Sequence, residues 1–384
     1  MSDPLLSEEE RMLQRTVREF ADRELVPRAR ELDEAERFPW ENLKGLASLG
    51  LMGLTVDPRY GGSGGGYREL AIATEEVARG CAGTSVCFIA HLSLGTSTIA
   101  RFGTEGQKER FLPPLARGEE LCAWALTEPG NGSDAAALQC TATPRGGRYL
   151  LNGAKTFITN GDLANTVVVF ATQDPSLRHR GVGVFVVEKG SPGFTANPQH
   201  GKMGMRASST AELVFDDCPV PAENRLGAEG EGFRIAMQVL DSSRIIIAAQ
   251  SVGIGQAAFE AAVRYSQQRV TFGKPLAEHQ AIQFMIADMA TQLDAARLLV
   301  RRAATLKDQD LPHGQESAMA KLFASEAAHF ACDRALQVHG GYGYFKESPV
   351  ERHYRDQRVV EIYEGSSEVQ RIVIARGVLK AMPV

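Results

Sequence analysis

One segment near the end of the chain reads ERHYRDQRVVEIYEGSSEVQR, from Glu351 to Arg371. Within it, the carboxylate of Glu364 stands between Tyr363 and Gly365, after a short apolar patch. Such surroundings desolvate a carboxylate and raise its pKa toward the range useful to a general base. The same residues also fit a helix start capped by a serine, Ser366 or Ser367. The two interpretations are compatible, because a helix N-terminus also binds anions. The local pattern alone favours the cap.

Composition and charge limit the classes of partner. The chain has 384 residues, of which 43% are hydrophobic, and its net charge is −5. This balance gives no indication of a nucleic acid or an anionic membrane as partner. No uninterrupted apolar run reaches the roughly 18–20 residues of a membrane span. The acidic N-terminus lacks the features of a signal or transit peptide, so we expect a cytoplasmic protein.

Cysteine and histidine spacing argues against disulfides and metals. Six cysteines are scattered without a CxxC pair, which is typical of reduced, mostly buried thiols. The eight histidines show neither HxxxH nor HxH spacing, so we expect no metal site.

The first part of the chain reads as helical and the second as a sheet. In residues 1–120, Ser7 and Glu10 form a capping-box pattern, and Pro27 is expected to kink or end the first helix. In residues 121–226, short runs rich in Val, Phe, Thr and Ile alternate with Gly, Asn and Pro turns. This alternation predicts an antiparallel β domain.

Residues 227–384 return to helical periodicity. Three long amphipathic stretches and a fourth helix after Ser366 predict a four-helix bundle; the three stretches are Phe233–Gln268, Gln280–Lys307 and Gln315–His339. The expected fold class is therefore α+β, mainly α, with a β domain between two helical ones.

One motif is rejected on its context. Gly253, Gly255 and Ala258 match the GxGxxA fingerprint of a dinucleotide-binding fold. Helical periodicity, however, runs unbroken from Phe233 to Tyr265, and no second strand with an acidic end follows. We expect these glycines to allow close packing of helices instead.

The wording HYRD…EIYEGSSEVQR resembles the active-site segment of acyl-CoA dehydrogenases, closest to the short-chain, butyryl-CoA members. The resemblance implies that Glu364 removes the α-proton of an acyl thioester. It covers almost the whole chain, and it implies FAD as cofactor and the family's fold, with N-terminal helical, middle β and C-terminal helical domains.

Two segments of the predicted β domain resemble the family's flavin-facing wall. In Trp124–Asp134, WALTEPGNGSD, the resemblance places Trp124, Leu126 and Thr127 at the flavin, and Ser133 at both the cofactor and the acyl-CoA. In Lys155–Gly161, KTFITNG, it places Phe157 and Thr159 beside the ring; the family commonly has Trp where this chain has Phe157. Without the resemblance, the first segment reads as a hairpin turn and the second as a half-buried strand.

A third group of segments resembles the part of the family that reaches the FAD of a neighbouring subunit. An arginine at a helix end, a nearby hydroxyl and a Gly-Gly cap suit a phosphate, although each alone is more often a cap or a surface ion pair. The resemblance implies at least a dimer and, as the family's usual state, a homotetramer built as a dimer of dimers. The residues are Arg269, Thr271, Phe272, His279, Gln280, Gln337, Gly340 and Gly341, and Ser366 and Glu368 join the expected cofactor contacts.

The expected acyl-CoA contacts lie on a helix and beside the base. Asp241 and Arg244 match the positions that meet the CoA moiety, although they also fit an ordinary i, i+3 helix pair. Tyr363 and Gly365 flank the base. The isovaleryl- and long-chain-type branches carry their base at the position of Ser243, so a serine there disfavours that type.

The expected activity is α,β-dehydrogenation of a short-chain acyl-CoA to the trans-2-enoyl-CoA, within fatty acid β-oxidation. The resemblance implies electron-transferring flavoprotein as the partner that takes the electrons. Branched-chain or aromatic acyl-CoA substrates, an acyl-CoA oxidase and a non-catalytic acyl-CoA-binding homologue stay as alternatives.

Overall fold

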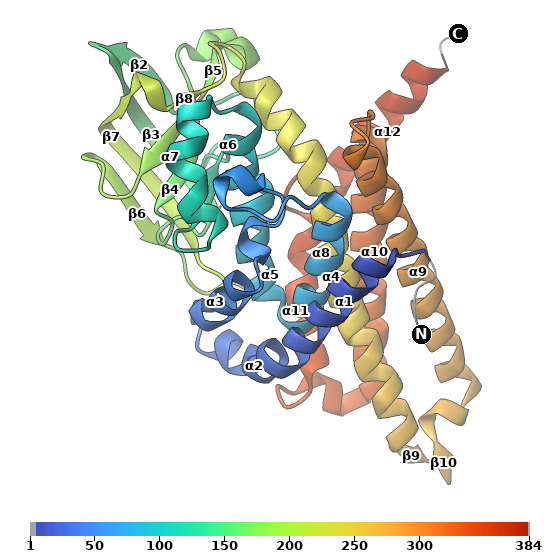
Figure 1. Cartoon of the computed structure of the whole chain (residues 1–384). Helices are drawn as coiled ribbons and strands as arrows, with labels where there is room; N and C mark the ends of the chain where they lie inside the picture. The colour runs from blue at the N-terminus through green and yellow to red at the C-terminus, as the bar shows by residue number, and fades with distance from the viewer. Residues whose placement is uncertain (1–4, 383–384) are drawn as a thin grey trace.

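The computed structural model describes residues 5–382 and arranges them as two helical parts and one sheet (Figure 1). The predicted division into a helical, a β and a second helical region is confirmed, while the boundaries after residues 120 and 226 stay predictions. The N-terminal helices are α1 (Glu8–Phe20), α2 (Val26–Glu34), α3 (Trp40–Ser48), α4 (Tyr67–Gly80), α5 (Ala82–Ile89), α6 (Ser97–Phe102) and α7 (Glu105–Ala116).

The start of the chain follows its predicted signals. The Ser7 hydroxyl accepts a hydrogen bond from the Glu10 N–H at 3.1 Å, and the Glu10 carboxylate accepts one from the Ser7 N–H at 2.7 Å. This reciprocal pair is the capping box. A π-helical segment, Ala21–Leu25, separates α1 from α2, and Pro27 lies in the first turn of α2, where its missing N–H is tolerated.

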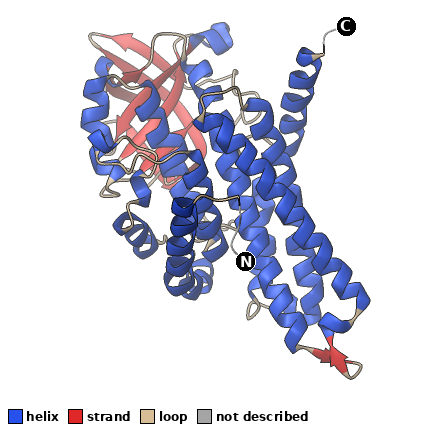
Figure 2. Ribbon diagram, turned by 45° about the vertical axis from the view of Figure 1, so that its right-hand side comes forward, coloured by secondary structure: helices blue, strands red, loops and turns tan. Residues whose placement is uncertain are grey.

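The middle region is a sheet of eight strands (Figure 2). The strand order is β6-β7-β3-β2-β4-β5-β8, and β1 pairs with β4. The pairing is antiparallel except where β4 meets β1 and β2. The strands are β1 (Cys122–Ala125), β2 (Thr141–Arg145), β3 (Arg148–Thr159), β4 (Thr166–Thr172), β5 (Val182–Glu188), β6 (Phe194–Pro198), β7 (Thr210–Pro221) and β8 (Arg225–Leu226).

The C-terminal region is built on three long helices and two shorter ones, drawn from yellow to red in Figure 1. A two-stranded hairpin of β9 (Val270–Thr271) and β10 (Lys274–Pro275) lies at the far end of the bundle. The helices are α8 (Gly232–Gln268), α9 (Gln280–Asp308), α10 (Gly314–His339), α11 (Pro349–Gln357) and α12 (Ser367–Ala381).

The rejected glycine motif lies inside α8. A Cβ at Gly253 would lie 2.2 Å from the Glu75 carbonyl oxygen of α4, and one at Gly255 would lie 2.6 Å from Leu293 of α9. These glycines therefore permit close helix packing, as predicted. By length and composition α8 could cross a membrane, but 83% of its most apolar window is buried inside the protein.

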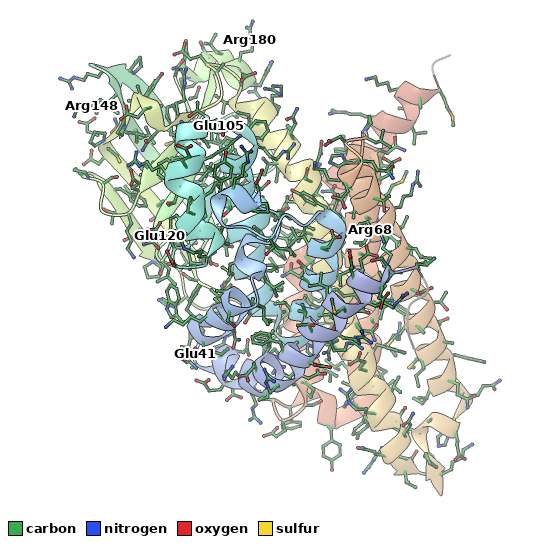
Figure 3. The ribbon with its side chains drawn as sticks, in the orientation of Figure 1. Glu41, Arg68, Glu105, Glu120, Arg148 and Arg180 are labelled. Carbon is green, nitrogen blue, oxygen red and sulfur yellow. The ribbon has the colours of Figure 1, made fainter. Side chains whose placement is uncertain are left out.

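Side-chain bonds join the two helical regions. Arg68, labelled in Figure 3, lies at the start of α4. It donates to both carboxylate oxygens of Glu10, at 2.6 and 2.9 Å, and to the Thr305 hydroxyl of α9 at 2.9 Å. The Asp308 carboxylate, at the end of α9, accepts from the Tyr67 N–H at 2.6 Å and the Arg68 N–H at 3.0 Å. The N-terminal helices are thereby fixed against the bundle that carries Glu364.

Candidate active site

Glu364 lies in a short turn between the 3₁₀ segment Arg358–Glu361 and α12. Its φ is +51° and that of Gly365 is +92°, so two successive residues adopt the left-handed region. For a residue other than glycine this conformation costs on the order of 1–2 kcal/mol. A Cβ at residue 365 would also lie 2.6 Å from the Gln370 side-chain nitrogen. The glycine after the base is therefore required by both conformation and space.

Side chains from three helices hold the carbonyl groups of this turn. The Arg244 Nε of α8 donates to the Glu364 carbonyl at 3.2 Å, and the Gln370 side chain of α12 donates to it at 3.3 Å. The Gly365 carbonyl accepts from Gln370 at 2.8 Å and from the Lys321 Nζ of α10 at 2.9 Å. These bonds offset the backbone strain and fix the direction of the Glu364 side chain.

The Glu364 carboxylate accepts a hydrogen bond from the Ser243 hydroxyl of α8. Burial raises the pKa of Glu364 to about 7, although the Ser243 hydrogen bond and the charges of Arg244 and Lys321 oppose that rise. A pKa near neutrality suits a general base. Ser243 stands at the position where other branches of the family carry their base. In this chain its hydroxyl contacts the predicted base directly.

A buried polar chain fixes the ring beside the base. The Tyr363 hydroxyl donates to the Gln250 side-chain oxygen of α8, and the Gln250 amide donates to the Ser85 hydroxyl of α5 at 2.7 Å. Burial raises the pKa of Tyr363 well above its usual value, so the phenol stays protonated. Sequence reasoning did not find Gln250, because no local pattern connects it with Tyr363.

Asp241 and Arg244 form the expected i, i+3 pair, with 2.8 Å between the Arg244 guanidinium and the Asp241 carboxylate. Arg244 is buried and also binds the Glu364 carbonyl, so it joins the predicted acyl-CoA residues to the base. Burial raises the pKa of Asp241.

The expected flavin wall comes from β1, the loop after it and β3. The fully buried Lys155 donates to the Leu126 carbonyl at 3.1 Å and pairs with Glu128 at 2.7 Å. The Thr127 carbonyl accepts from the Thr156 N–H at 2.9 Å. Leu126 and Thr127 are thus held by backbone and buried ionic contacts, whereas Ser133 lies exposed on the loop.

Phe157 is displayed at a break in the sheet. The β3–β7 register shifts between Lys155 and Ile158, and Phe157 has a φ of +59° and a 71% exposed side chain. Thr159 follows, paired with Thr210 of β7. Trp124 packs edge-on against Phe170 with 4.8 Å between ring centroids. An aromatic face placed outward beside a polar loop fits the isoalloxazine ring of FAD.

The start of α12 also fits a polar ligand. Ser366 is the N-cap residue, but its side chain makes no capping hydrogen bond, so the expected serine cap is wrong in this detail. The Ser366 hydroxyl instead lowers the pKa of the exposed Glu368. Within residues 5–382, the buried Ser367 hydroxyl and the buried Trp124 indole N–H have no hydrogen-bond partner.

The remaining predicted cofactor residues gather at the far end of the bundle. An open pocket of about 800 Å³ is lined there by Arg269, Thr271, Gly340 and Gly341, among others. His279 lies 3.3 Å from the Thr271 carbonyl. Gln280 and Gln337 are exposed nearby in sequence, and Phe272 is 97% exposed on the hairpin.

This pocket is remote from Glu364. Arg244, which binds the Glu364 carbonyl, lies within α8, and Arg269 follows the last residue of that helix. The 25 residues between them correspond to roughly 37 Å along a helix. One chain therefore does not bring the two groups of predicted cofactor residues together.

Other expectations concern cysteines and metals. All six cysteines are free and buried, as predicted. In the part of the chain that the structure describes, no group of three or more His, Cys, Asp or Glu side chains is arranged to hold a metal ion.

Comparison with known families divides the chain among three acyl-CoA dehydrogenase models. The N-terminal domain matches residues 7–119, the middle domain residues 123–218 and the C-terminal domain residues 230–379. The chain belongs to the acyl-CoA dehydrogenase family, and it is a FAD-dependent oxidoreductase that acts on an acyl-CoA.

The chain is similar over nearly its whole length to three proteins of known name. The short-chain specific acyl-CoA dehydrogenase of Bos taurus is 48% identical, over 98% of this chain and 91% of that protein. An acryloyl-CoA reductase (NADH) of Anaerotignum propionicum is also 48% identical, over 98% and 95%. The solved structure of butyryl-CoA dehydrogenase from Megasphaera elsdenii superposes with a TM-score of 0.96 at 44% identity, over 98% of this chain and 100% of that chain.

Proposed function

We propose that the protein oxidises a short-chain acyl-CoA to the trans-2-enoyl-CoA, with Glu364 as the base that removes the α-proton. One observation carries the assignment: Glu364 is a half-buried carboxylate with a pKa near 7, held by Ser243 and by a turn that three helices clamp. When bound, FAD supplies the acceptor for the β-hydride at its N5 atom.

The residues of the turn answer the central difficulty of the reaction. A thioester α-C–H is a far weaker acid than a carboxylic acid, so the developing negative charge needs hydrogen-bond donors at the thioester oxygen. Within residues 5–382 the Glu364 N–H has no hydrogen-bond partner and is left to serve as such a donor. Burial raises the pKa of Glu364 and so narrows the remaining difference between it and the pKa of the thioester α-C–H.

The cofactor residues support an oligomer. Because the Glu364 turn and the Arg269 pocket lie far apart in one chain, we propose that Arg269, Thr271, Phe272, His279, Gln280, Gln337, Gly340 and Gly341 serve the FAD of a second subunit. The strongly exposed Phe272 on the hairpin fits an intersubunit contact. A homotetramer built as a dimer of dimers follows the family's usual state.

The partner and the setting follow from the same reaction. We propose electron-transferring flavoprotein as the acceptor of the electrons, fatty acid β-oxidation as the pathway served and the cytoplasm as the location. Branched-chain and aromatic acyl groups stay as alternatives for the substrate, and an oxidase would be recognised by rapid peroxide formation.

A second candidate function runs in the opposite direction. The acryloyl-CoA reductase is as similar to this chain as the short-chain dehydrogenase is, at 48% identity each. The same Glu364 would then deliver a proton to the α-carbon, since an acid–base group serves both directions of a reversible reaction.

Anaerobic spectroscopy separates these functions. Butyryl-CoA added to the purified yellow protein should bleach the flavin band, whereas the E364Q variant should stay yellow and unbleached. Bleaching of E364Q at a near-normal rate would overturn Glu364 as the base. A wild-type protein that does not bleach with butyryl-CoA, but oxidises NADH with acryloyl-CoA when its electron-transfer partner is added, would favour the reductase. A colourless protein that cannot be reconstituted with FAD would favour the non-catalytic homologue.

A further inference from the structure

Lys321 is a buried amine beside the base, and so far only its hydrogen bond to the turn has been described, not a role for its charge. It lies on α10, its side chain is fully buried, and its Nζ donates to the Gly365 carbonyl at 2.9 Å. Fully buried lysines are rare unless they are paired with an acid. Within residues 5–382, Lys321 forms no salt bridge. A direct ion pair therefore does not explain why this lysine is buried.

The charged groups around Lys321 come from four elements. Burial lowers its pKa to about 8, and the carboxylate of Glu364 is the strongest influence that opposes this fall. Arg244 of α8 lowers the pKa further, while Glu361 of the preceding 3₁₀ segment and Glu368 of α12 raise it. The groups facing Glu364 are Arg244 and Lys321, with the Ser243 hydroxyl. Lys321 and Glu364 thus influence each other's protonation.

We propose that Lys321 is a positioning residue for the base: it holds the Gly365 carbonyl, and its positive charge favours the carboxylate form of Glu364. The proposal rests on Glu364 being the base. The hydrogen bond helps Gln370 to hold the Gly365–Ser366 peptide, which follows the two left-handed residues Glu364 and Gly365. The charge acts through space on the carboxylate, without the direct contact that would form a closed ion pair.

The sign of the effect follows from the charges. A nearby cation favours the ionised form of a carboxylate, so removal of the Lys321 charge raises the pKa of Glu364. A base works only when deprotonated. The acid limb of the pH–rate profile should therefore move to higher pH in a variant that lacks the charge.

Three substitutions separate the charge from the hydrogen bond. K321Q keeps a donor without a charge, K321M removes both, and K321R keeps a charge and a donor. The rate of anaerobic flavin reduction by butyryl-CoA is measured from pH 5 to pH 9 for each folded, FAD-loaded variant. We expect the acid limb of K321Q and K321M to rise by about half a pH unit, with a roughly threefold lower rate at pH 6, and that of K321R to stay near wild type.

A second readout needs neither substrate nor FAD. The carboxyl absorption of Glu364 is isolated in infrared spectra by subtracting the E364Q spectrum at each pH, in the wild-type and in the K321Q background. Its titration midpoint should rise in K321Q. This measurement succeeds or fails independently of the reaction, whereas bleaching of E364Q itself would overturn the proposed function.

Lys202 provides a matched control. It is a largely buried lysine whose Nζ donates to the Ser208 hydroxyl at 2.7 Å and the Thr210 hydroxyl at 3.0 Å, and Glu364 is not among the groups that influence its pKa. K202Q should leave the Glu364 midpoint unmoved. An unmoved midpoint in a folded K321Q or K321M, or a K202Q shift of equal size, would overturn the proposal.

The proposal stays testable if neither neutral variant folds. Because the two groups act on each other, E364Q must then lower the pKa of Lys321 below its value of about 8. The unfolded state holds its lysine protons in this range, so stability rises with pH once folded Lys321 loses its proton. That rise should begin at lower pH in E364Q than in wild type. An onset at the same pH would overturn the coupling.

Discussion

The molecule buries two lysines near two carboxylates and uses them differently. In the β domain, Lys155 and Glu128 lie 2.7 Å apart in a closed ion pair. In the bundle, Lys321 binds a backbone carbonyl, and Glu364 binds a serine hydroxyl instead of the lysine. The first arrangement, the ion pair of Lys155 and Glu128, has a structural role, and we call it the joint. The second leaves Glu364, the base, with a pKa near neutrality.

The two carboxylates respond to burial with opposite results. Burial tends to raise the pKa of Glu128, but the charge and hydrogen bond of Lys155 and the N–H groups of Gln139 and Cys140 outweigh it, so the pKa is lowered. At Glu364, burial prevails and the pKa rises to about 7. The contrast teaches that burial raises the pKa of a carboxylate only where no close cation and N–H donors outweigh it.

Neutralising the reactive carboxylate should have the largest effect. E364Q removes the proton acceptor while it keeps the shape of the side chain, so flavin reduction by butyryl-CoA should fall by about 10³-fold or more. Stopped-flow absorbance of the FAD-loaded protein measures it. E326Q, which neutralises an exposed carboxylate on the outside of α10, is the control and should reduce at the wild-type rate. Equal rates in both variants would mean that Glu364 is not the base.

Removal of Lys155 from the joint should lower the free energy of unfolding more than removal of Lys321 beside the base. K155M leaves the Glu128 charge buried without its partner and should lower the free energy of unfolding by about 3–5 kcal/mol. K321M strands no directly paired carboxylate and should change it by about 1 kcal/mol or less. Urea denaturation followed by tryptophan fluorescence compares the two. Similar losses would place Lys321 in an ion pair after all.

The position of the base could be predicted from the sequence, but the residues that surround it in the fold could not. Tyr363, Gly365 and the neighbouring apolar residues mark Glu364 locally, and the structure confirms the raised pKa that they predict. Gln250 and Lys321, in contrast, reach the turn from helices more than 40 residues away in the chain. Helical periodicity predicts which face of a helix is buried, but not which residue of another segment lies opposite it.

One signal for Lys321 was nevertheless present. It shares a buried face of α10 with Ala318, Ser325 and Ala328, so a lysine interrupts a stripe of small residues. The Ser366 cap failed for a different reason: its side chain acts on Glu368 instead of the helix N–H groups. The helix start was predictable, while the choice between two nearby partners was not.

The pH dependence of stability should have opposite signs in the two regions. Glu364 has a folded pKa above its unfolded value, so its contribution to stability is fully present below about pH 4.5 and is lost as the pH rises through about 7. Relative to E364Q, wild type should lose on the order of 1–3 kcal/mol across this window.

Glu128 has a lowered folded pKa, so its contribution is present above the unfolded value and is lost as the pH falls through the folded one. Relative to E128Q, wild type should therefore lose stability on the acid side. Denaturation curves at several pH values test both slopes. The same sign for both variants would contradict the contrast between the joint and the base.

The last expected effect concerns the Ser243 hydroxyl, which binds Glu364 where Glu128 has a lysine. Ser243 has a single proton, and its oxygen also lies 3.2 Å from the Leu240 carbonyl, so its bond to Glu364 competes with a second acceptor. The Ser243 hydrogen bond is the strongest influence that opposes the effect of burial on Glu364, so S243A should raise the pKa of Glu364 and move the acid limb of flavin reduction up by about one pH unit. S242A, one residue earlier on α8 with its hydroxyl bonded to the Gln238 carbonyl, should leave the limb in place. A shift in S243A smaller than that in K321Q would mean that the distant charge of Lys321, and not the hydrogen bond, is the stronger of the two influences.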